Sequence, residues 1–282
     1  MLAPPLLDAL IDRILEEDLH GGDLTTESCV EALAEALGEA VARKPLVVCG
    51  SLVFRRVFER LDASVRFEEL IPDGQAVETG AVIWRVRGKA RTLLSAERTA
   101  LNLTQRMSGV ATTARRYVGA LPEGSRTRIT DTRKTTPGLR ALERYAVRVG
   151  GASNHRNDLG SAVLIKDNHL VAAGGIAAAV ERARARAPHT SRIEVEVASL
   201  AELEQAITAR ADVIMLDNFS LADVHAAVAR VRAAAPSVLI EVSGGITLPR
   251  IAELAAAGVD LISVGALTHS APAADIALDL SL

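Results

Sequence analysis

The sequence predicts an α/β protein in which a mixed α+β region precedes a barrel of parallel strands and helices. From about Arg126 to Thr268, short apolar or β-branched runs alternate with helical stretches in six successive strand-then-helix units. This regular alternation is typical of parallel α/β architecture. The first hundred residues lack it and mix helix-like with strand-like segments. We favour a barrel, complete or incomplete, over the alternative of a doubly wound sheet.

The α+β region opens with a predicted helix over residues 6–17, followed by the turn-rich segment EDLHGGDLTTES. A second helix is expected near residues 52–61, and strands are expected around IPDGQAVETGAVIWRVRGKA. A longer helical stretch begins at Ser95 with SAERTALNLTQRMSGVATTARRYV, whose S-x-x-R start resembles a capping box without its acid. This stretch is expected to lead into the barrel.

The length also favours two domains. With 282 residues and 49% hydrophobic content, the chain can bury one large core or two moderate ones. We place the boundary near Gly109, which gives an N-terminal domain of residues 1–109 and a barrel domain of residues 110–269. Residues 270–282 could pack back on the first domain.

The barrel region contains strand-like runs with helical segments between them. The intervening segments, such as SLAELEQAITAR, begin with Ser or Thr at a plausible cap and place apolar residues three or four apart. Two strands, RIT and AVLI, end immediately before Asp131 and Lys166. The other four strands are RIEVEV from Arg192, DVIML from Asp212, SVLIEV from Ser237 and LISV from Leu261.

Cations gather where the first two of these strands end. In parallel α/β sheets, ligands bind at the carboxyl ends of the strands. So many cations in a chain of net charge -3 suggest a multiply anionic ligand, since guanidinium and ammonium groups bind carboxylate and phosphate. Arg144 and Arg148 share a helical face with Arg140, and we interpret them as solvated charges. The concentrated cations are Arg133, Lys134, Arg140, His155, Arg156 and Lys166.

Two acids follow the next strands. Glu196 and Asp217 offer the hard oxygen ligands that hold Mg²⁺ directly or through water. Either acid alone would be interpreted as a hydrogen-bonding residue, but two on adjacent strand ends facing cations favour a metal site. Glu194 shares a strand face with Glu196, and the residue nearer the strand end is preferred as the ligand.

Glycines follow the last two strands in the segments SGGI and VGAL. Glycine lets backbone N–H groups approach an anion, and the next helix adds its positive N-terminal end. Ser243, Gly244, Gly245 and Gly265 therefore form a candidate phosphate cradle, with glycines needed only for tight turns as the alternative. Among the histidines, His155 is a candidate ligand contact, His169 and His269 could lie near the site, and the others are interpreted as incidental.

The composition argues against several other classes of protein. Aromatic content of 2% and a pI near 6.1 do not suit a nucleic-acid surface. No apolar run reaches the roughly 18 residues needed to span a bilayer, and the N-terminal region carries Asp8 and Asp12 instead of a basic signal. We therefore expect a cytoplasmic protein with no membrane or nucleic-acid partner. Cys29 and Cys49 are expected to be reduced and structural.

Motifs along nearly the whole chain resemble those of the quinolinate phosphoribosyltransferases, also called carboxylating nicotinate-nucleotide pyrophosphorylases. The resemblance is carried, in order, by EEDLHGGDLTT, ERTALNLTQRMSGVAT, DTRKTTPGLR, GGASNHRNDLGSAVLIKDNH, EVEV, LDNF, EVSGGI and VGALTHS. It implies an N-terminal α/β sandwich domain followed by an open α/β (TIM-like) barrel, in a homodimer or an assembly of dimers. It also implies that quinolinate and phosphoribosyl pyrophosphate give nicotinate mononucleotide, pyrophosphate and carbon dioxide, a reaction of NAD biosynthesis.

The resemblance also implies roles for individual residues. Quinolinate would contact Arg133, His155, Arg156 and Lys166, with Arg98 of the ERT motif entering from a second subunit. Lys134 and Lys166 would face both substrates and act in catalysis. Glu196 and Asp217 would serve the ribose hydroxyls and Mg²⁺. The phosphate would be surrounded by Ser243, Gly244, Gly245, Gly265 and His269.

Other activities are left open by the sequence. A homologue associated with molybdenum transport shares the fold and has an uncertain substrate, but the intact TRKT, NHR and KDNH motifs favour quinolinate. A Schiff-base aldolase using Lys166 would leave the Glu196 and Asp217 pair unexplained. A non-catalytic phosphometabolite-binding regulator would show damage to at least one charged strand end, and none is found.

Overall fold

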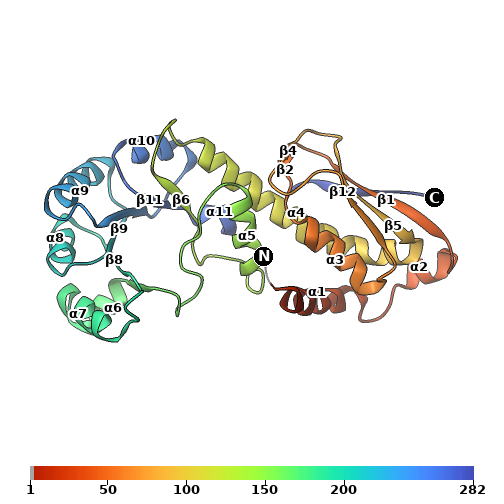
Figure 1. The fold of residues 1–282 in the computed structure, drawn as a ribbon, viewed down its shortest axis with the longest axis horizontal. Helices are drawn as coiled ribbons and strands as arrows, with labels where there is room; N and C mark the ends of the chain where they lie inside the picture. The colour runs from red at the N-terminus through yellow and green to blue at the C-terminus, as the bar shows by residue number, and fades with distance from the viewer. Residues whose placement is uncertain (1–2) are drawn as a thin grey trace. The chain divides into compact units, whose positions relative to one another are not determined.

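The computed structural model describes residues 3–282, which form two compact units (Figure 1). The first unit contains the chain up to Arg115 together with residues 135–151 and 270–282. The second unit contains residues 116–134 and 152–269. Among the described residues, no helix combines the length and the apolar character required to cross a membrane.

The first unit is built on an antiparallel sheet with helices. Its four strands lie in the order β12, β1, β5, β3. These strands are β1 (Glu35–Ala42), β3 (Arg66–Glu69), β5 (Val82–Lys89) and β12 (Ile276–Ser281). A separate two-stranded sheet pairs β2 (Leu46–Val47) with β4 (Ala76–Val77). The helices are α1 (Pro4–Leu19), α2 (Leu24–Cys29), α3 (Ser51–Leu61), most of α4 (Ala90–Gly119) and α5 (Arg140–Val149).

An aromatic cluster forms the centre of the first unit's core. The amphipathic helix α3 buries Phe54 and Phe58 completely, and the ring of Phe54 lies 4.8 Å from that of the buried Trp84 on β5 and 5.0 Å from that of Phe58. Tilted aromatic pairs at this separation add to the stabilisation from burial alone. On α1, Leu7 and Ile11 are buried at the one-turn spacing of an amphipathic helix.

The second unit is a six-stranded parallel sheet in the order β6, β11, β10, β9, β8, β7. Its strands are β6 (Arg128–Thr130), β7 (Val163–Ile165), β8 (Ile193–Val197), β9 (Val213–Asp217), β10 (Leu239–Ser243) and β11 (Leu261–Ser263). Strands consecutive in the chain are neighbours from β7 to β11, and the last strand returns to the first at β6. This is barrel topology, because a doubly wound sheet reverses its strand order.

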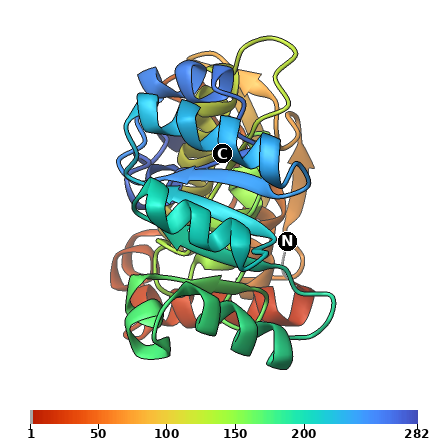
Figure 2. The same cartoon turned by 90° about the vertical axis from the view of Figure 1, so that its left-hand side faces the viewer.

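The barrel is open between β6 and β7. Within residues 3–282, no strand ladder joins these two strands, and β6 makes only an isolated bridge from Thr130 to Ser153 on that side. Helices α7 (Ile176–Arg186), α8 (Leu200–Thr208) and α9 (Leu221–Ala234) lie outside the curved sheet (Figures 1 and 2). The remaining helices of this unit are α6 (Asp167–Ala173), α10 (Ile251–Ala256), α11 (Ala266–His269) and a short 3₁₀ turn at Leu248–Arg250.

The expected boundary near Gly109 lies inside α4, a continuous helix of 30 residues. Glycine is required there by packing, since a Cβ atom would lie 2.0 Å from the carbonyl oxygen of Pro272. Residues 276–281 pair with β1 as strand β12. Residues 135–151, expected in the barrel, group instead with the first unit and carry Arg140 into it. Cys29 is exposed, Cys49 is buried, and both are free thiols.

Candidate active site

A cavity of about 460 Å³ lies at the carboxyl ends of the barrel strands. Ten of the residues singled out in the sequence line it, all of them in the second unit. They are Arg133, Lys134, His155, Arg156, Lys166, Glu196, Asp217, Ser243, Gly244 and Gly245. The parallel sheet thus brings one predicted set of strand-end residues into one pocket.

One side of the cavity is cationic. Arg133 and Lys134 follow β6, Lys166 follows β7, and Arg156 lies on the connection between these strands. Burial lowers the pKa of Arg156, and the neighbouring positive charge of Arg133 lowers it further. Two guanidinium groups held this close repel each other, so an anion with carboxylate or phosphate groups would relieve the repulsion.

Two neighbouring side chains, those of Thr268 and His169, fix the main chain of Lys134 and Lys166. Thr268 Oγ1 donates a hydrogen bond to the carbonyl oxygen of Lys134 at 2.7 Å. The backbone N–H of Lys166 donates to Nδ1 of His169 at 2.9 Å. His169 therefore acts on the backbone beside the cavity and does not line it.

The same cavity also carries the two expected acids. Glu196 near the end of β8 forms an ion pair with the ammonium group of Lys166. Asp217 is the last residue of the adjacent strand β9, and its carboxylate accepts a hydrogen bond from Asn218 Nδ2 at 2.8 Å. The two carboxylates are half-buried on neighbouring strands of one pocket. Such oxygen donors fit Mg²⁺, which binds through one or two carboxylates together with substrate phosphates.

The glycine loop after β10 has a conformation that needs glycine. Gly244 has φ +86°, and a Cβ atom there would lie 2.3 Å from Oδ1 of Asn218. A side chain at this position is therefore excluded both by backbone geometry and by contact. Gly245 also has positive φ, at +56°. These positive φ values support the interpretation that the glycines are needed for a tight turn. Because glycines have no side chains, the backbone of this loop remains open to the cavity.

Gly265 and His269 lie beside the cavity instead of lining it. A Cβ atom on Gly265 would lie 3.0 Å from the ring of His269 and 3.1 Å from Cδ of Lys134. The missing side chain therefore leaves room for the aliphatic stem of Lys134.

Arg98 lies on α4 in the first unit, where it is exposed. It borders a separate cavity of about 240 Å³ that is also lined by Asp23 and Ser95. Within that cavity's wall, Ser95 Oγ donates to Asp23 Oδ2 at 2.8 Å, which ties α4 to the turn after α1. Arg98 is not among the residues that line the barrel cavity.

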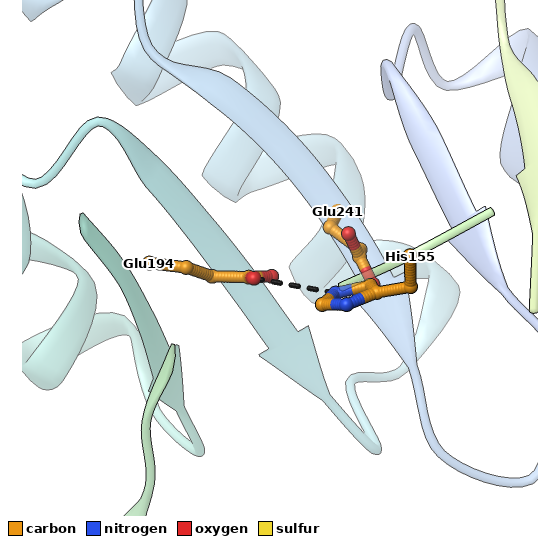
Figure 3. Close-up of side chains that lie close together, drawn as sticks. All are labelled: His155, Glu194 and Glu241. Atoms are coloured by element: carbon orange, nitrogen blue, oxygen red, sulfur yellow. Dashed lines mark ion pairs between the residues drawn. The ribbon is translucent and has the colours of Figure 1, made fainter. Parts of the chain in front are cut away.

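Two buried acids meet His155 inside the barrel (Figure 3). His155 Nε2 lies 3.2 Å from Glu194 Oε2 and 3.5 Å from Glu241 Oε1. Burial acts to lower the pKa of His155, but the hydrogen bond with Glu194 and the charges of both acids outweigh it and raise that pKa. Burial, together with the charge of Glu194, raises the pKa of Glu241 to about 7.

The sequence pattern favoured Glu196 over Glu194 as a ligand and gave no prediction for Glu241 or Asp131. Strand alternation carried a usable signal, because Glu241 precedes the pocket residue Ser243 by two positions and so shares its inward face. Asp131 is fully buried after β6 and accepts hydrogen bonds from the backbone N–H of His155 at 2.7 Å and from Asn154 Nδ2 at 2.6 Å. Its role depends on contacts that a local pattern does not contain.

The open parallel barrel and its cationic pocket place the chain in the class of α/β-barrel enzymes that bind anionic ligands at their strand ends. More narrowly, the chain belongs to the quinolinate phosphoribosyltransferase family. The model of that family's N-terminal domain matches residues 23–108, and the model of its C-terminal domain matches residues 110–279. These matches confirm the resemblance seen in the motifs.

Individual relatives agree with this assignment over nearly the full chain. The nicotinate-nucleotide pyrophosphorylase [carboxylating] of Mycobacterium leprae is 45% identical, over 96% of this chain and 95% of its own. The human protein of the same name is 41% identical, over 99% and 93%. The solved structure of the nicotinate-nucleotide pyrophosphorylase from Francisella tularensis is 39% identical, with a TM-score of 0.93 over 100% of this chain and 98% of that one.

Proposed function

We propose that this chain is a quinolinate phosphoribosyltransferase that acts in NAD biosynthesis. It transfers the phosphoribosyl group of phosphoribosyl pyrophosphate to quinolinate and releases pyrophosphate and carbon dioxide, leaving nicotinate mononucleotide. The observation that carries this proposal is a single barrel pocket lined by several cations and by a carboxylate pair, in a chain that matches both domains of the family. Such a pocket suits one dicarboxylate and one polyphosphate together.

Quinolinate would bind at the cationic side. Its two carboxylates match the paired donors of Arg133 and Arg156, and Lys166 adds a point charge. The substrate charge would relieve the repulsion that lowers the pKa of Arg156. His155 lines the same wall.

The phosphoribosyl substrate would bind between the acids and the glycine loop. Glu196 and Asp217 are placed to accept hydrogen bonds from the ribose hydroxyls, and the backbone around Ser243, Gly244 and Gly245 to receive the phosphate. The same two carboxylates would hold Mg²⁺, which when bound neutralises charge on the pyrophosphate group. Gly265 and His269 would lie next to the phosphate, and the missing side chain of Gly265 leaves room for Lys134 and for the His269 ring.

The reaction needs little covalent participation from the protein. As the bond from ribose C1 to pyrophosphate breaks, positive charge develops on the ribosyl centre and negative charge on the leaving group. Lys134 and Lys166 would stabilise the leaving group electrostatically while the bound pyridine nitrogen attacks C1. Ribosylation makes the ring nitrogen cationic, so it can stabilise the electron pair left on the adjacent ring carbon when the carboxylate leaves as carbon dioxide, and that carbon then takes up a proton to give nicotinate mononucleotide.

The proposal is tested by incubating the purified protein with quinolinate, phosphoribosyl pyrophosphate and Mg²⁺ and measuring nicotinate mononucleotide. Product should require all three. Undiminished turnover in excess chelator would refute the metal assignment, and equal use of nicotinate would refute a dicarboxylate pocket. Borohydride trapping of substrate on Lys166 would favour the aldolase alternative. Absence of turnover with intact substrate binding would favour the alternative of a non-catalytic phosphometabolite-binding regulator. A cytoplasmic location is a separate proposal, which this assay does not address.

We further propose a homodimer, or an assembly of dimers, in which Arg98 completes the partner subunit's pocket. Arg98 is exposed on α4, outside the barrel cavity, whereas the family resemblance assigns it to quinolinate. Arg98→Ala and Lys134→Ala homodimers should each be inactive. A mixed dimer rebuilds one intact site and should regain activity, whereas exchanged subunits that stay inactive would show that each Arg98 serves its own barrel.

A further inference from the structure

The barrel opening is filled by a short segment that carries two of the pocket cations. Ser153 attaches this segment to β6, since its N–H donates to Ile129 O at 2.8 Å and its carbonyl accepts from the N–H of Asp131 at 3.2 Å. At the other end, Arg156 Nη1 donates to the carbonyl of Ala162, next to β7, at 3.2 Å. Residues 153–156 therefore bridge the two edge strands without belonging to a ladder.

The His155 side chain anchors this segment from inside the barrel. Its ring reaches the carboxylates of Glu194 on β8 and Glu241 on β10, which Figure 3 shows pointing toward it. Both acids are buried, with 7% of Glu194 and 1% of Glu241 exposed. His155 lines the substrate cavity above and also a second cavity of about 240 Å³ at the amino ends of the strands. The three side chains thus form part of the wall between the two cavities.

The surrounding hydrogen bonds determine which ring nitrogen carries a proton. The backbone N–H of Arg156 donates to His155 Nδ1 at 2.7 Å, so Nδ1 presents its lone pair. A neutral ring then carries its proton on Nε2, where it can be donated to Glu194. A metal ion bound to the three side chains through this nitrogen would need Nε2 without a proton, so the geometry opposes a metal site at this position.

A purely structural purpose would not favour this cluster. Two buried carboxylates next to each other are costly, and well-packed apolar residues are often at least as stabilising as buried charged groups. Oε1 of Glu194 and Oε1 of Glu241 are buried with no hydrogen-bond partner among residues 3–282, which adds to the cost. The cluster is therefore better explained by a role in holding the His155 ring, and the segment that carries it, in place.

We propose that Glu241 and Glu194 are positioning residues for the quinolinate side of the pocket, acting through His155 on Arg156. This inference rests on the proposed function for its substrate. Glu194 accepts the Nε2–H of His155 and Glu241 faces the same nitrogen at 3.5 Å. The ring accepts the N–H of Arg156, and Asp131 accepts the backbone N–H of His155. Releasing the ring would remove the anchor of residues 153–156 inside the barrel and let this segment shift, and Arg156 with it.

Kinetics distinguish positioning from general destabilisation. Glu241→Leu removes one of the two carboxylates that face the His155 ring; it should raise KM for quinolinate about tenfold and should leave KM for phosphoribosyl pyrophosphate unchanged. Glu241→Gln keeps the shape and an acceptor and should restore most of the quinolinate affinity. Glu253→Gln, on the exposed face of α10, is the matched control. A parallel rise in both KM values, or unchanged KM in Glu241→Leu, would overturn the proposal.

A spectroscopic measurement keeps the inference testable if Glu241→Leu does not fold or the enzyme shows no turnover. In protein labelled with ¹⁵N-histidine, the His155 signal, assigned with His155→Gln, should show a protonated Nε2 in wild type and a changed environment in Glu194→Gln. An unprotonated Nε2, or a His155 signal that moves when Zn²⁺ or chelator is added, would overturn it. Absence of turnover with the expected signal would refute the proposed function and leave the anchoring geometry intact.

Discussion

Both units bury mostly apolar side chains, but each contains one buried cluster of a different kind. The first unit buries Phe54, Phe58 and Trp84 in mutual contact. The barrel buries Glu194 and Glu241 against His155. Apolar burial stabilises a fold directly, whereas buried carboxylates reduce its stability unless they are compensated. We infer that the aromatic cluster serves the stability of its unit, and that the acid cluster in the barrel gives up stability for the arrangement of a site.

The strongest test of this comparison is Phe54→Ala. Removing a fully buried ring from the aromatic cluster should lower the free energy of unfolding by about 3–5 kcal/mol. Denaturant unfolding measures this loss. The kcat of the remaining folded protein should be close to that of wild type, and a large fall in kcat per folded molecule would show that the first core also shapes the site.

Lys134→Ala should have the reverse profile. Lys134 is exposed at the end of β6, so its removal should leave the melting temperature nearly unchanged. Loss of one electrostatic contact to the leaving group should lower kcat by about 100- to 1,000-fold. Steady-state assays with both substrates saturating measure the effect, and a fall of less than about tenfold would remove Lys134 from the catalytic group.

The stability given up in the barrel should depend on pH. Burial raises the pKa of Glu241 to about 7 in the folded chain, above the ordinary value of 4.5, so the folded state binds a proton more tightly than the unfolded state. The contribution of Glu241 to stability is therefore present at low pH and is lost as pH rises from about 4.5 to about 7.

Glu241→Gln removes this ionisation. The variant should gain stability relative to wild type at pH 8, on the order of 1–3 kcal/mol, and should gain little at pH 4.5. Thermal melts at the two pH values measure the difference. An equal effect at both pH values would mean that Glu241 does not hold a proton in the folded barrel.

The smallest expected effect comes from Arg133→Lys, which keeps the charge but loses the paired donors. The binding free energy for quinolinate should become less favourable by more than about 1 kcal/mol, which is the contribution of an exposed ion pair. Isothermal titration with quinolinate gives the affinity directly. If binding is unchanged, Arg133 lies outside the quinolinate contacts, and the cationic side of the pocket would depend on Arg156 and Lys166.

Much of the architecture could be predicted because its signals are local. The six strand-and-helix units are visible in short runs such as RIEVEV and DVIML, and the strand-end residues follow from where those runs stop. The expected start at Ser95 was five residues late, since α4 begins at Ala90 directly after β5. Gly88, the glycine nearest this junction, lies within β5 and does not mark the end of the strand, and β5 continues into α4 with no residue between them.

By itself, the sequence determined the barrel class, the strand-end cations and acids, and the family, since periodicity and motif order are properties of neighbouring residues. Tertiary structure alone decided that the barrel opens between β6 and β7 and that Arg140 belongs to the first unit. It also decided that Glu194 and Glu241 meet at His155. These outcomes depend on which strands become neighbours and on which side chains then share a buried space, and no local pattern encodes those long-range pairings.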